Sequence, residues 1–470
     1  MNITAIGAAG GEQRMPTPQP TATTATTAAV RTVERRRGPS GSVLLVESSR
    51  ALPLVHLVVA IRSGSAWDPH KKDGLMNLMG EVARRGAAGR PREDIDAQID
   101  RLGATLDVRT DADALRLEGH VLTRYLDDYL RIIADILLRP DFTADELVRT
   151  RREILADIDE LRNDDQALAQ RFFVRNLYSD HPYGHPPEGD RASLERIRRE
   201  DLRAHYRRHM VGPNVIFAAA GDIGAEDFAD RVSRSFAALP QGSAPGPNPL
   251  AMREPQPPKG WRIQIVDKPD RHQAQILFGQ LGVPATDPDY VPLLVAVSGF
   301  GGHGMKATLM DEVRTKRGLA YGAYMTLAET LARGPITGWF FTENDKAVST
   351  LKLVLRLYVG LMEKGIDDAG VIFARNFLAG AQASAMDDPE HRLAARVSAE
   401  IAGLSPAFVD DLPDRIRTVT PTQVRTAIVR HVRAHDLAIT AVATAASLRA
   451  SLIAAKVQPS AIDVVPYQGY

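Results

Sequence analysis

The chain has no cysteine among its 470 residues, which excludes disulfide bonds, thiolate metal ligands and a cysteine nucleophile. It has no net charge either, since 58 basic side chains balance 58 acidic ones, so its bulk charge gives no reason to expect a nucleic acid or a membrane surface as partner. No apolar run approaches the length of about 18 residues that a membrane-spanning helix needs. Any metal site in this protein would have to use histidine, aspartate and glutamate.

Two segments have the composition of unfolded or linking chain. Residues 1–40 begin with a stretch rich in Pro, Thr and Ala that contains no apolar core of the length a secretory signal needs. We predict a disordered tail there and a cytoplasmic protein, or a periplasmic one if a signal peptide is missing from the sequence. Residues 241–260 are rich in Pro and Gly without periodicity, which predicts a linker between domains at 41–240 and 261–470.

Apolar periodicity predicts alternating helices and strands in both domains. The predicted helical stretches lie at residues 73–86, 93–102, 125–138, 143–178, 290–317, 346–403 and 422–432. The predicted strands lie at residues 105–110, 114–121, 215–220, 262–266, 274–281, 321–327, 336–341 and 437–442, with two more in the apolar runs that begin near residue 43.

The two predicted domains have matching beginnings and matching ends. VHLVVAIRSGS corresponds to AQILFGQLGVP, and NVIFAAAGD corresponds to DLAITAVAT. We infer an internal duplication of about 200 residues, which is too long for a solenoid repeat and indicates tandem domains.

The segment Leu309–Tyr324, LMDEVRTKRGLAYGAY, predicts a short amphipathic helix followed by a strand. Acidic residues come early and basic residues late, an order that suits the helix dipole. Gly318 stands where a left-handed residue ends a helix, and apolar alternation follows it. Arg317 is therefore expected at the end of the helix and Tyr321 on the strand.

This segment resembles the C-terminal half of the M16 (pitrilysin-type, inverzincin) metallopeptidases, in which a helix ending in Arg-Gly-Leu-Ala-Tyr supplies an Arg and a Tyr to a site of peptide hydrolysis. The resemblance implies catalytic roles for Arg317 and Tyr321, which would hold the substrate backbone and stabilise the oxyanion on the attacked carbonyl. The alternative is that Arg317 only caps a helix C-terminus and Tyr321 is an ordinary strand aromatic.

The resemblance covers nearly everything beyond the tail. It implies an α+β fold, an α/β sandwich of two tandem homologous domains, each an antiparallel-rich sheet packed with helices, in a clam-shell arrangement. The glycine-rich GFGGHG before the segment contains Gly301, Gly302 and His303, which we expect to contact a peptide substrate. It lacks the Lys-Ser/Thr pair of a phosphate loop, so nucleotide binding is not expected.

Members of the M16 family that cut peptides carry His-x-x-Glu-His on the first helix of the N-terminal half, with a further Glu about 75 residues on. In this chain the matching helix reads GLMNLMGEV, so both imidazoles and the general base are missing. The corresponding positions hold Asn77, Gly80 and Glu81, and the downstream ligand position is matched best by Asp157, with Glu153 and Glu160 as alternatives.

This donor set makes a poor zinc site, because zinc prefers nitrogen or sulfur donors alongside carboxylate. Nothing at Gly80 could take a proton from water, even if a hard cation bound weakly at Glu81 and Asp157. We therefore expect no metal in this chain and interpret Glu81 and Asp157 as solvated charges on helix faces.

The remaining histidines offer one alternative metal site. His205 and His209 in HYRRH are four residues apart, a spacing that can bind a metal from one helix face. The arginines between them would repel a dication, so we predict surface histidines. His181 and His185 in HPYGH are interpreted as turn residues, and His431 falls near a helix end.

A chain that keeps the Arg and Tyr but lacks the zinc set resembles one subunit of a split M16 peptidase. The leading hypothesis is a non-catalytic subunit of a heterodimer that acts on peptides, with zinc in the sister subunit, no cofactor in this chain, and neither nucleic acid nor membrane as partner. Processing of a precursor peptide is one task that such pairs perform. The alternatives are a scaffold subunit, like the core proteins of respiratory complexes, and a metal-dependent hydrolase that uses His205 and His209.

Overall fold

The computed structural model describes residues 33–246, 253–302 and 304–469 of the chain. Most of the predicted disordered tail, residues 1–32, lies outside these residues. The prediction is wrong at the end of the tail, because Val33–Arg37 forms a strand, β1, that pairs with the next strand in antiparallel register.

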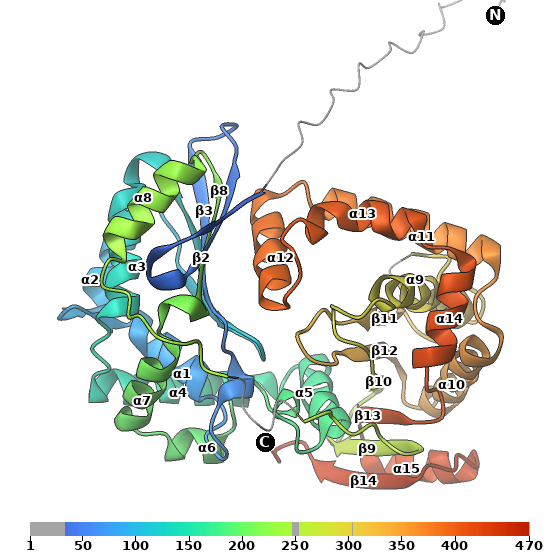
Figure 1. The fold of residues 1–470 in the computed structure, drawn as a ribbon. Coiled ribbons are helices and arrows are strands. Elements are labelled where there is room, and N and C mark those ends of the chain that lie inside the picture. The colour runs from blue at the N-terminus through green and yellow to red at the C-terminus, as the bar shows by residue number, and fades with distance from the viewer. Residues whose placement is uncertain (1–32, 247–252, 303, 470) are drawn as a thin grey trace, which may run out of the picture. The chain divides into compact units, whose positions relative to one another are not determined.

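The first sheet has six strands in the order β1-β2-β8-β3-β7-β6, and Figure 1 labels three of them, β2, β3 and β8. Besides β1, its strands are β2 (Val43–Ser48), β3 (Leu54–Ile61), β6 (Asp107–Thr110), β7 (Leu115–Leu122) and β8 (Val215–Gly221). Only β2 and β8 run parallel. Strands β2, β3 and β8 bury side chains on both faces, which is why their sequences are almost continuously apolar.

The second sheet also has six strands, in the order β11-β12-β10-β13-β9-β14. They are β9 (Trp261–Asp267), β10 (Gln273–Leu281), β11 (Ala323–Leu327), β12 (Pro335–Glu343), β13 (Leu437–Ala443) and β14 (Ala461–Pro466). Five strands of this sheet, β9, β13, β10, β12 and β11, follow the order of β2, β8, β3, β7 and β6 in the first sheet, while the sixth strand comes from the C-terminal end of the chain (β14) in one sheet and from before β2 (β1) in the other. The outermost strand differs in direction, since β14 runs parallel to its neighbour and β1 antiparallel. The shared topology supports the inferred duplication.

The helices of the first half are α1 (Leu75–Arg84), α2 (Arg92–Arg101), α3 (Leu126–Leu138), α4 (Ala144–Leu161), α5 (Asp165–Tyr178), α6 (Arg191–Arg196), α7 (Arg199–His209) and α8 (Ala225–Ser235). Those of the second half are α9 (Tyr290–Gly301), α10 (Ala347–Lys364), α11 (Asp368–Ala385), α12 (Pro389–Ile401), α13 (Phe408–Thr418), α14 (Pro421–His431) and α15 (Ala445–Ala454). A short two-stranded sheet, β4 (Gly86–Ala87) with β5 (Arg90–Pro91), follows α1. Among the described residues, no helix is long and apolar enough to cross a lipid bilayer.

The helical stretch predicted at residues 143–178 is broken into α4 and α5. Asp164 ends the continuity, because its carboxylate accepts the backbone N–H groups of Gln166 and Ala167 and starts a new helix. The first sheet uses residues 33–221 and the second uses residues 261–466. The domain bounds of 41–240 and 261–470 stay a prediction, and residues 247–252 of the predicted linker lie outside the described residues.

Helix α5, from the first half, packs on β10 and β13 of the second sheet. Phe172, Phe173 and Leu177 of α5 share a buried cluster with apolar residues of those strands. Gly279 of β10 lies close to β12 and to this helix, since a Cβ atom there would lie 2.1 Å from the backbone oxygen of Ile336 and 3.0 Å from Phe173 Cζ.

Helix α12, from the second half, makes the reciprocal contact with β3 and β8 of the first sheet (Figure 1). Leu393, Val397 and Ile401 bury its apolar face against those strands. The two sheets are therefore joined by an exchange of one helix in each direction, and cutting the chain at the linker would leave both sheets partly uncovered.

An ion-pair cluster fixes α12 at this interface. Glu47 of β2, 1% exposed, accepts hydrogen bonds from Arg392 and Arg396, and Arg396 is fully buried. Burial alone would raise the pKa of Glu47, but hydrogen bonding by Arg392 and the charge of Arg396 outweigh it and lower the pKa. Further along α12, Glu400 binds Arg35 at 2.9 Å, and Arg62 at 2.5 Å.

Candidate functional site

Helix α1 contains the positions of the family's zinc motif, and one buried carboxylate fixes where it begins. Asp68 accepts the backbone N–H groups of Gly74, Leu75 and Met76 at 2.8, 3.1 and 2.8 Å. These donors belong to the first turn, which has no partners within the helix itself. Burial raises the pKa of Asp68 well above its ordinary value. The segment before α1 therefore sets the orientation of the motif positions.

The position of the family's general base is closed by core packing. Gly80 is buried, and a Cβ atom there would lie 2.5 Å from Leu115 Cδ1 and 3.1 Å from Val108 Cγ1. A glutamate at this position would have to displace both side chains. Asn77, one turn earlier, is half-buried. Position 80 therefore serves the contact between α1 and the sheet.

A cation of the chain itself binds Glu81. The Arg85 guanidinium lies 3.3 Å from the Glu81 carboxylate and also forms an ion pair with Glu153 of α4. Arg92 approaches the same Glu153 at 3.7 Å. Burial raises the pKa of Glu81 although the charge of Arg85 opposes the shift. The guanidinium supplies the positive charge that two neighbouring carboxylates need in a partly buried site.

The structure places Glu153 opposite α1, whereas Asp157 is exposed. Asp157 is thus a solvated charge as predicted, but that prediction is wrong for Glu81, whose spacing of four from Arg85 was a signal for the pair. Within the described ranges, no cluster of His, Asp and Glu close enough for a metal includes Glu81 or Asp157. Without imidazole or thiolate, these donors do not fit zinc.

Restoring the motif with Asn77→His, Gly80→Glu and Glu81→His is expected to destabilise the chain without creating a stoichiometric zinc site. Overpacking against Leu115 should lower the free energy of unfolding by about 1–3 kcal/mol. Urea denaturation and metal analysis of the purified variant measure the two effects. The double variant Asn77→His with Glu81→His, which keeps Gly80, is the control. Full stability with one tightly bound zinc in the triple variant would contradict the prediction.

In the second half, a π-helix at Met310–Thr315 leads to the Arg/Tyr motif. Such wide turns are frequent at functional sites. Gly318 has a positive φ of 58°, which confirms that it ends the helix in the left-handed region. Arg317 Nη1 donates to the backbone oxygen of Glu312 at 2.8 Å and pairs with its carboxylate. Hydrogen bonds from Lys316 and Arg317 lower the pKa of Glu312.

Tyr321 lies two residues before β11, so its predicted place on the strand is wrong. Its side chain is 75% exposed. The ring stacks on Phe341 of β12, with centroids 6.0 Å apart and planes 13° from parallel. A cavity of about 380 Å³ opens beside both rings. The contact with Phe341 restricts the orientation of this exposed ring.

Tyr321 is the first of four neighbouring aromatic side chains, which we call the aromatic row. The ring centroids of Trp339 and Phe341 lie 5.4 Å apart, and the Tyr324 ring stacks on that of Trp339 with centroids 5.8 Å apart. Trp339 Nε1 donates to Gln275 at 3.0 Å. Because Trp339 and Phe341 are two residues apart on β12, they share one face of the sheet. We did not predict this row, although the alternation in ITGWFF was a signal for it.

The glycine-rich segment packs against the sheet. Gly301 and Gly302 are buried, and a Cβ atom on Gly301 would lie 2.5 Å from Met325 Cβ, so this glycine allows α9 to approach β11. His303 lies outside the described residues. Contact of Gly301, Gly302 and His303 with a substrate stays a prediction.

The prediction of surface histidines in HYRRH is wrong, because α7 buries this face against α1. His205 and His209 are both buried, with ring centroids 4.2 Å apart. His209 Nδ1 lies 2.9 Å from Ser63 Oγ. Burial lowers the pKa of His205 to about 3 and that of His209 to about 4. Asp68 lies 3.7 Å from His205, but its carboxylate is occupied by the first turn of α1.

Acidification is expected to destabilise the chain through His209. The unfolded imidazole binds a proton near its ordinary pKa of 6.5, while the folded one stays neutral to about 4. Stability is therefore complete above the unfolded pKa and falls by about 1.4 kcal/mol per pH unit as the pH drops below it. Urea denaturation at about pH 7 and about pH 5 measures this slope. His205, whose folded pKa is lower still, adds a slope of the same size. His209→Gln should therefore remove about half of the combined slope, and the exposed control His391→Gln should leave it unchanged; equal slopes in all three proteins would contradict the assignment.

The turn around HPYGH forms as predicted, with a short 3-10 helix at Pro182–Gly184. His181 Nδ1 accepts the backbone N–H of Tyr183. His185 lies 2.6 Å from Asp73, and this hydrogen bond raises the pKa of His185. Both histidines are structural residues of the turn.

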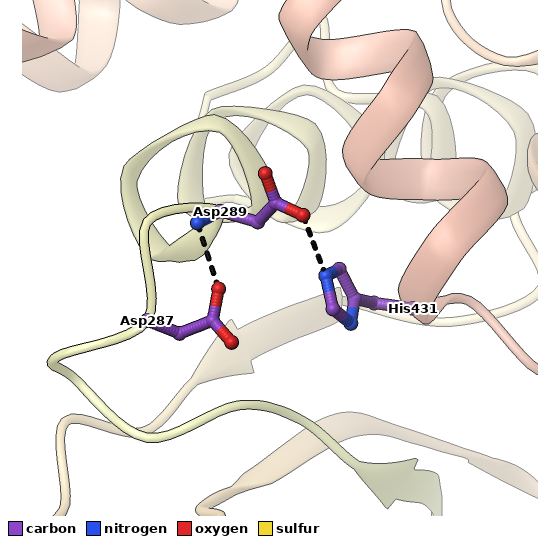
Figure 2. A group of neighbouring side chains, drawn as sticks. All are labelled: Asp287, Asp289 and His431. Carbon is purple, nitrogen blue, oxygen red and sulfur yellow. Dashed lines mark hydrogen bonds and ion pairs between the residues drawn. The ribbon is translucent and has the colours of Figure 1, made fainter.

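One cluster in the described residues has the spacing of a metal site: Asp287, Asp289 and His431 (Figure 2). Asp289 lies 2.9 Å from His431 Nε2 and 3.1 Å from Arg430, and its backbone N–H donates to Asp287. The hydrogen bond from His431, and then Arg430, lower the pKa of Asp289. The cluster connects the end of α14 to the beginning of α9, and Arg430 already forms an ion pair with the Asp289 carboxylate.

Two tandem sheets of shared topology and a peptidase motif without its zinc donors define a two-domain, peptidase-like protein. Residues 43–191 match the family described as insulinase (peptidase family M16), and residues 196–378 match the peptidase M16 inactive domain. The chain therefore belongs to the M16 family.

Its relatives include proteins with and without peptidase names. The non-peptidase homolog YmxG of Helicobacter pylori is 22% identical over 396 residues, which cover 84% of this chain and 90% of that protein. An uncharacterized zinc protease of Streptomyces coelicolor is 23% identical over 403 residues, which cover 85% and 87%. A crystal structure of the peptidase M16 inactive domain from Pseudomonas fluorescens has a TM-score of 0.79 and 26% identity, and covers 92% of this chain and 99% of that one.

Proposed function

We propose that this chain is the non-catalytic subunit of a heterodimeric M16 zinc peptidase and presents Arg317 and Tyr321 to a peptide bound by a zinc-bearing sister subunit. The observation that supports it is a contrast between the halves. Arg317 and Tyr321 are exposed in the segment between the π-helix and β11. Glu81, at the zinc-motif position, is bound by Arg85. The chain exposes an arginine and a tyrosine that can bind a substrate, whereas the carboxylate at its zinc-motif position is paired with an arginine.

Arg317 and Tyr321 can both donate hydrogen bonds to an oxygen atom that gains negative charge. A peptide carbonyl under attack develops such a charge, and donors already in place stabilise it at little cost in reorganisation. The Glu312 contact holds the Arg317 guanidinium, and Phe341 holds the Tyr321 ring, so both are oriented before a substrate arrives. The sister's zinc would activate the attacking water and polarise the same carbonyl.

The aromatic row adds an apolar surface next to these donors. Flat ring faces contact aliphatic and aromatic side chains of a peptide without demanding one sequence. The proposed substrate is therefore an extended or unfolded peptide, and a precursor peptide is one candidate.

A scaffold role is the second candidate. A chain of the complex III structure from Candida albicans has a TM-score of 0.73 and 15% identity, and covers 89% of this chain and 97% of that one. If this protein serves assembly alone, it will bind a sister subunit but tolerate any change at Arg317 and Tyr321.

The test combines the purified chain with a zinc-bearing M16 subunit encoded beside it. A quenched fluorescent peptide reports hydrolysis by each subunit and by the pair, and metal analysis locates the zinc. We expect turnover only by the pair, with zinc in the sister. Tight zinc binding and peptide hydrolysis by the isolated chain, free of contaminants, would refute the proposal.

A further inference from the structure

Helix α11 exposes an apolar face that nothing in the described part of the chain covers. Three of the large apolar side chains exposed in that part belong to this helix: Ile372, Phe373 and Phe377. Phe373 and Phe377 are 42% and 39% exposed, and their rings stack with centroids 6.3 Å apart. From residue 369 to residue 385, Arg375 is the only ionisable residue in the sequence of this helix. A solvent-facing helix normally carries more charge than this.

A hollow of about 690 Å³ adjoins this face, between α9, α10 and α11. Phe373 forms one wall, and the lining includes Phe300, Leu361 and Ile366. The space beside Gly360 is open, since a Cβ atom there would have no neighbour within 4 Å. A mostly apolar hollow of this size can take a large side chain together with the backbone around it.

Three cations surround the hollow: Lys306, Arg356 and Lys364. In the described ranges none of them has an ion pair or a hydrogen bond, and Lys306 lies 5.8 Å from the centre of the Phe373 ring. Asp367 is the carboxylate at the rim, and it accepts the Gly370 N–H at 2.7 Å to cap α11. The rim therefore presents positive charge that the chain itself does not neutralise.

We propose that this surface, the α11 patch, binds an acidic and apolar segment of the zinc-bearing sister subunit. One large side chain of that segment would fill the hollow, and its carboxylates would face Lys306, Arg356 and Lys364. The inference rests on the proposed function, because it takes the sister subunit as the partner. An uncharged apolar face beside uncompensated cations fits such a segment in both shape and charge.

The concave shape distinguishes this partner from a lipid surface. A membrane contacts side chains that protrude in one plane, whereas a hollow flanked by stacked rings is filled by a side chain that enters it. Anchors of this kind, buried at the centre of an interface, contribute most of the binding free energy.

The experiment measures the affinity of the full-length chain for the sister subunit by calorimetry. Lys306→Glu with Lys364→Glu, and separately Phe373→Ser with Phe377→Ser, should each raise the Kd by about tenfold or more. The matched controls are Arg449→Glu and Ile453→Ser, an exposed cation and an exposed apolar residue on α15, which should stay within about twofold of wild type. Added salt should weaken the wild-type complex and affect the charge-reversal variant less.

The outcomes separate this inference from the proposed function. Wild-type affinity in both patch variants would overturn the α11 patch, and peptide hydrolysis by those complexes would leave the proposed function standing. No assembly of the wild-type chain with the sister would refute both. Wild-type binding to phosphatidylglycerol vesicles that is lost in the patch variants, with subunit affinity unchanged, would identify a lipid surface instead and overturn the proposal. Circular dichroism checks that each variant is folded.

Discussion

Replacing Arg317 by alanine is expected to lower the turnover of the two-subunit peptidase by about tenfold or more, and Tyr321→Phe is expected to have a similar effect. In the proposed function, each variant removes a donor to charge that develops only in the transition state, so kcat should fall more than KM changes. Steady-state kinetics of the reconstituted pair on a fluorescent peptide measure both parameters.

Neither substitution should unfold the complex, because both side chains are exposed. In the part of the chain that the structure describes, Glu312 is the only residue to which Arg317 donates hydrogen bonds, and phenylalanine at position 321 keeps the stacking on Phe341. Arg425→Ala and Tyr125→Phe, outside the proposed site, are the matched controls. Full turnover in both site variants, with normal assembly, would favour the scaffold role.

Replacing Glu47 by alanine is expected to lower the free energy of unfolding by about 3–5 kcal/mol, because it leaves the buried guanidinium groups of Arg392 and Arg396 without their carboxylate. Asp410 binds Arg396 from the other side but is more exposed and cannot replace Glu47. Urea denaturation measures the loss, and hydrogen exchange should locate it in α12.

Two comparisons separate this cluster from ordinary ion pairs. Glu34→Ala, which removes the exposed Glu34–Arg36 pair, should cost no more than about 1 kcal/mol. Glu47→Leu with Arg392→Met and Arg396→Met should recover most of the lost stability, because no charge is then buried alone.

Since the pKa of Glu47 is lowered by folding, the stability that Glu47 contributes is present above the unfolded pKa and is lost as the pH falls through the folded pKa. A cost below about 1 kcal/mol for Glu47→Ala would show that α12 is held by apolar contact alone.

Local signals in the sequence were sufficient for several features. A glycine after a short helix with acidic residues early and basic residues late predicted a helix end at Gly318. The positive φ of Gly318 confirms this prediction. Apolar runs such as that around β3 gave strands, because a segment buried on both faces needs apolar side chains throughout. Five strands of each sheet match in order because both halves repeat these runs.

For the histidine pair and the zinc-motif positions, local sequence signals did not predict which other helix packs against the residues. A spacing of four places His205 and His209 on one helix face, but it does not say whether that face meets solvent or α1. In the same way, Glu81 is a carboxylate at a ligand position, and only the packing of α4 on α1 brings Glu153 to Arg85 beside it.

The sequence by itself determined the family, the paired sheets, the missing zinc donors and the surviving Arg317 and Tyr321, because each depends on residue type at a fixed spacing. Only the tertiary structure decided that α5 packs on the second sheet and α12 on the first, that Arg85 joins Glu81 to Glu153, and that a row of rings lies beside Tyr321. These features need residues from distant segments to meet, and periodicity describes one face of an element without naming what will cover it.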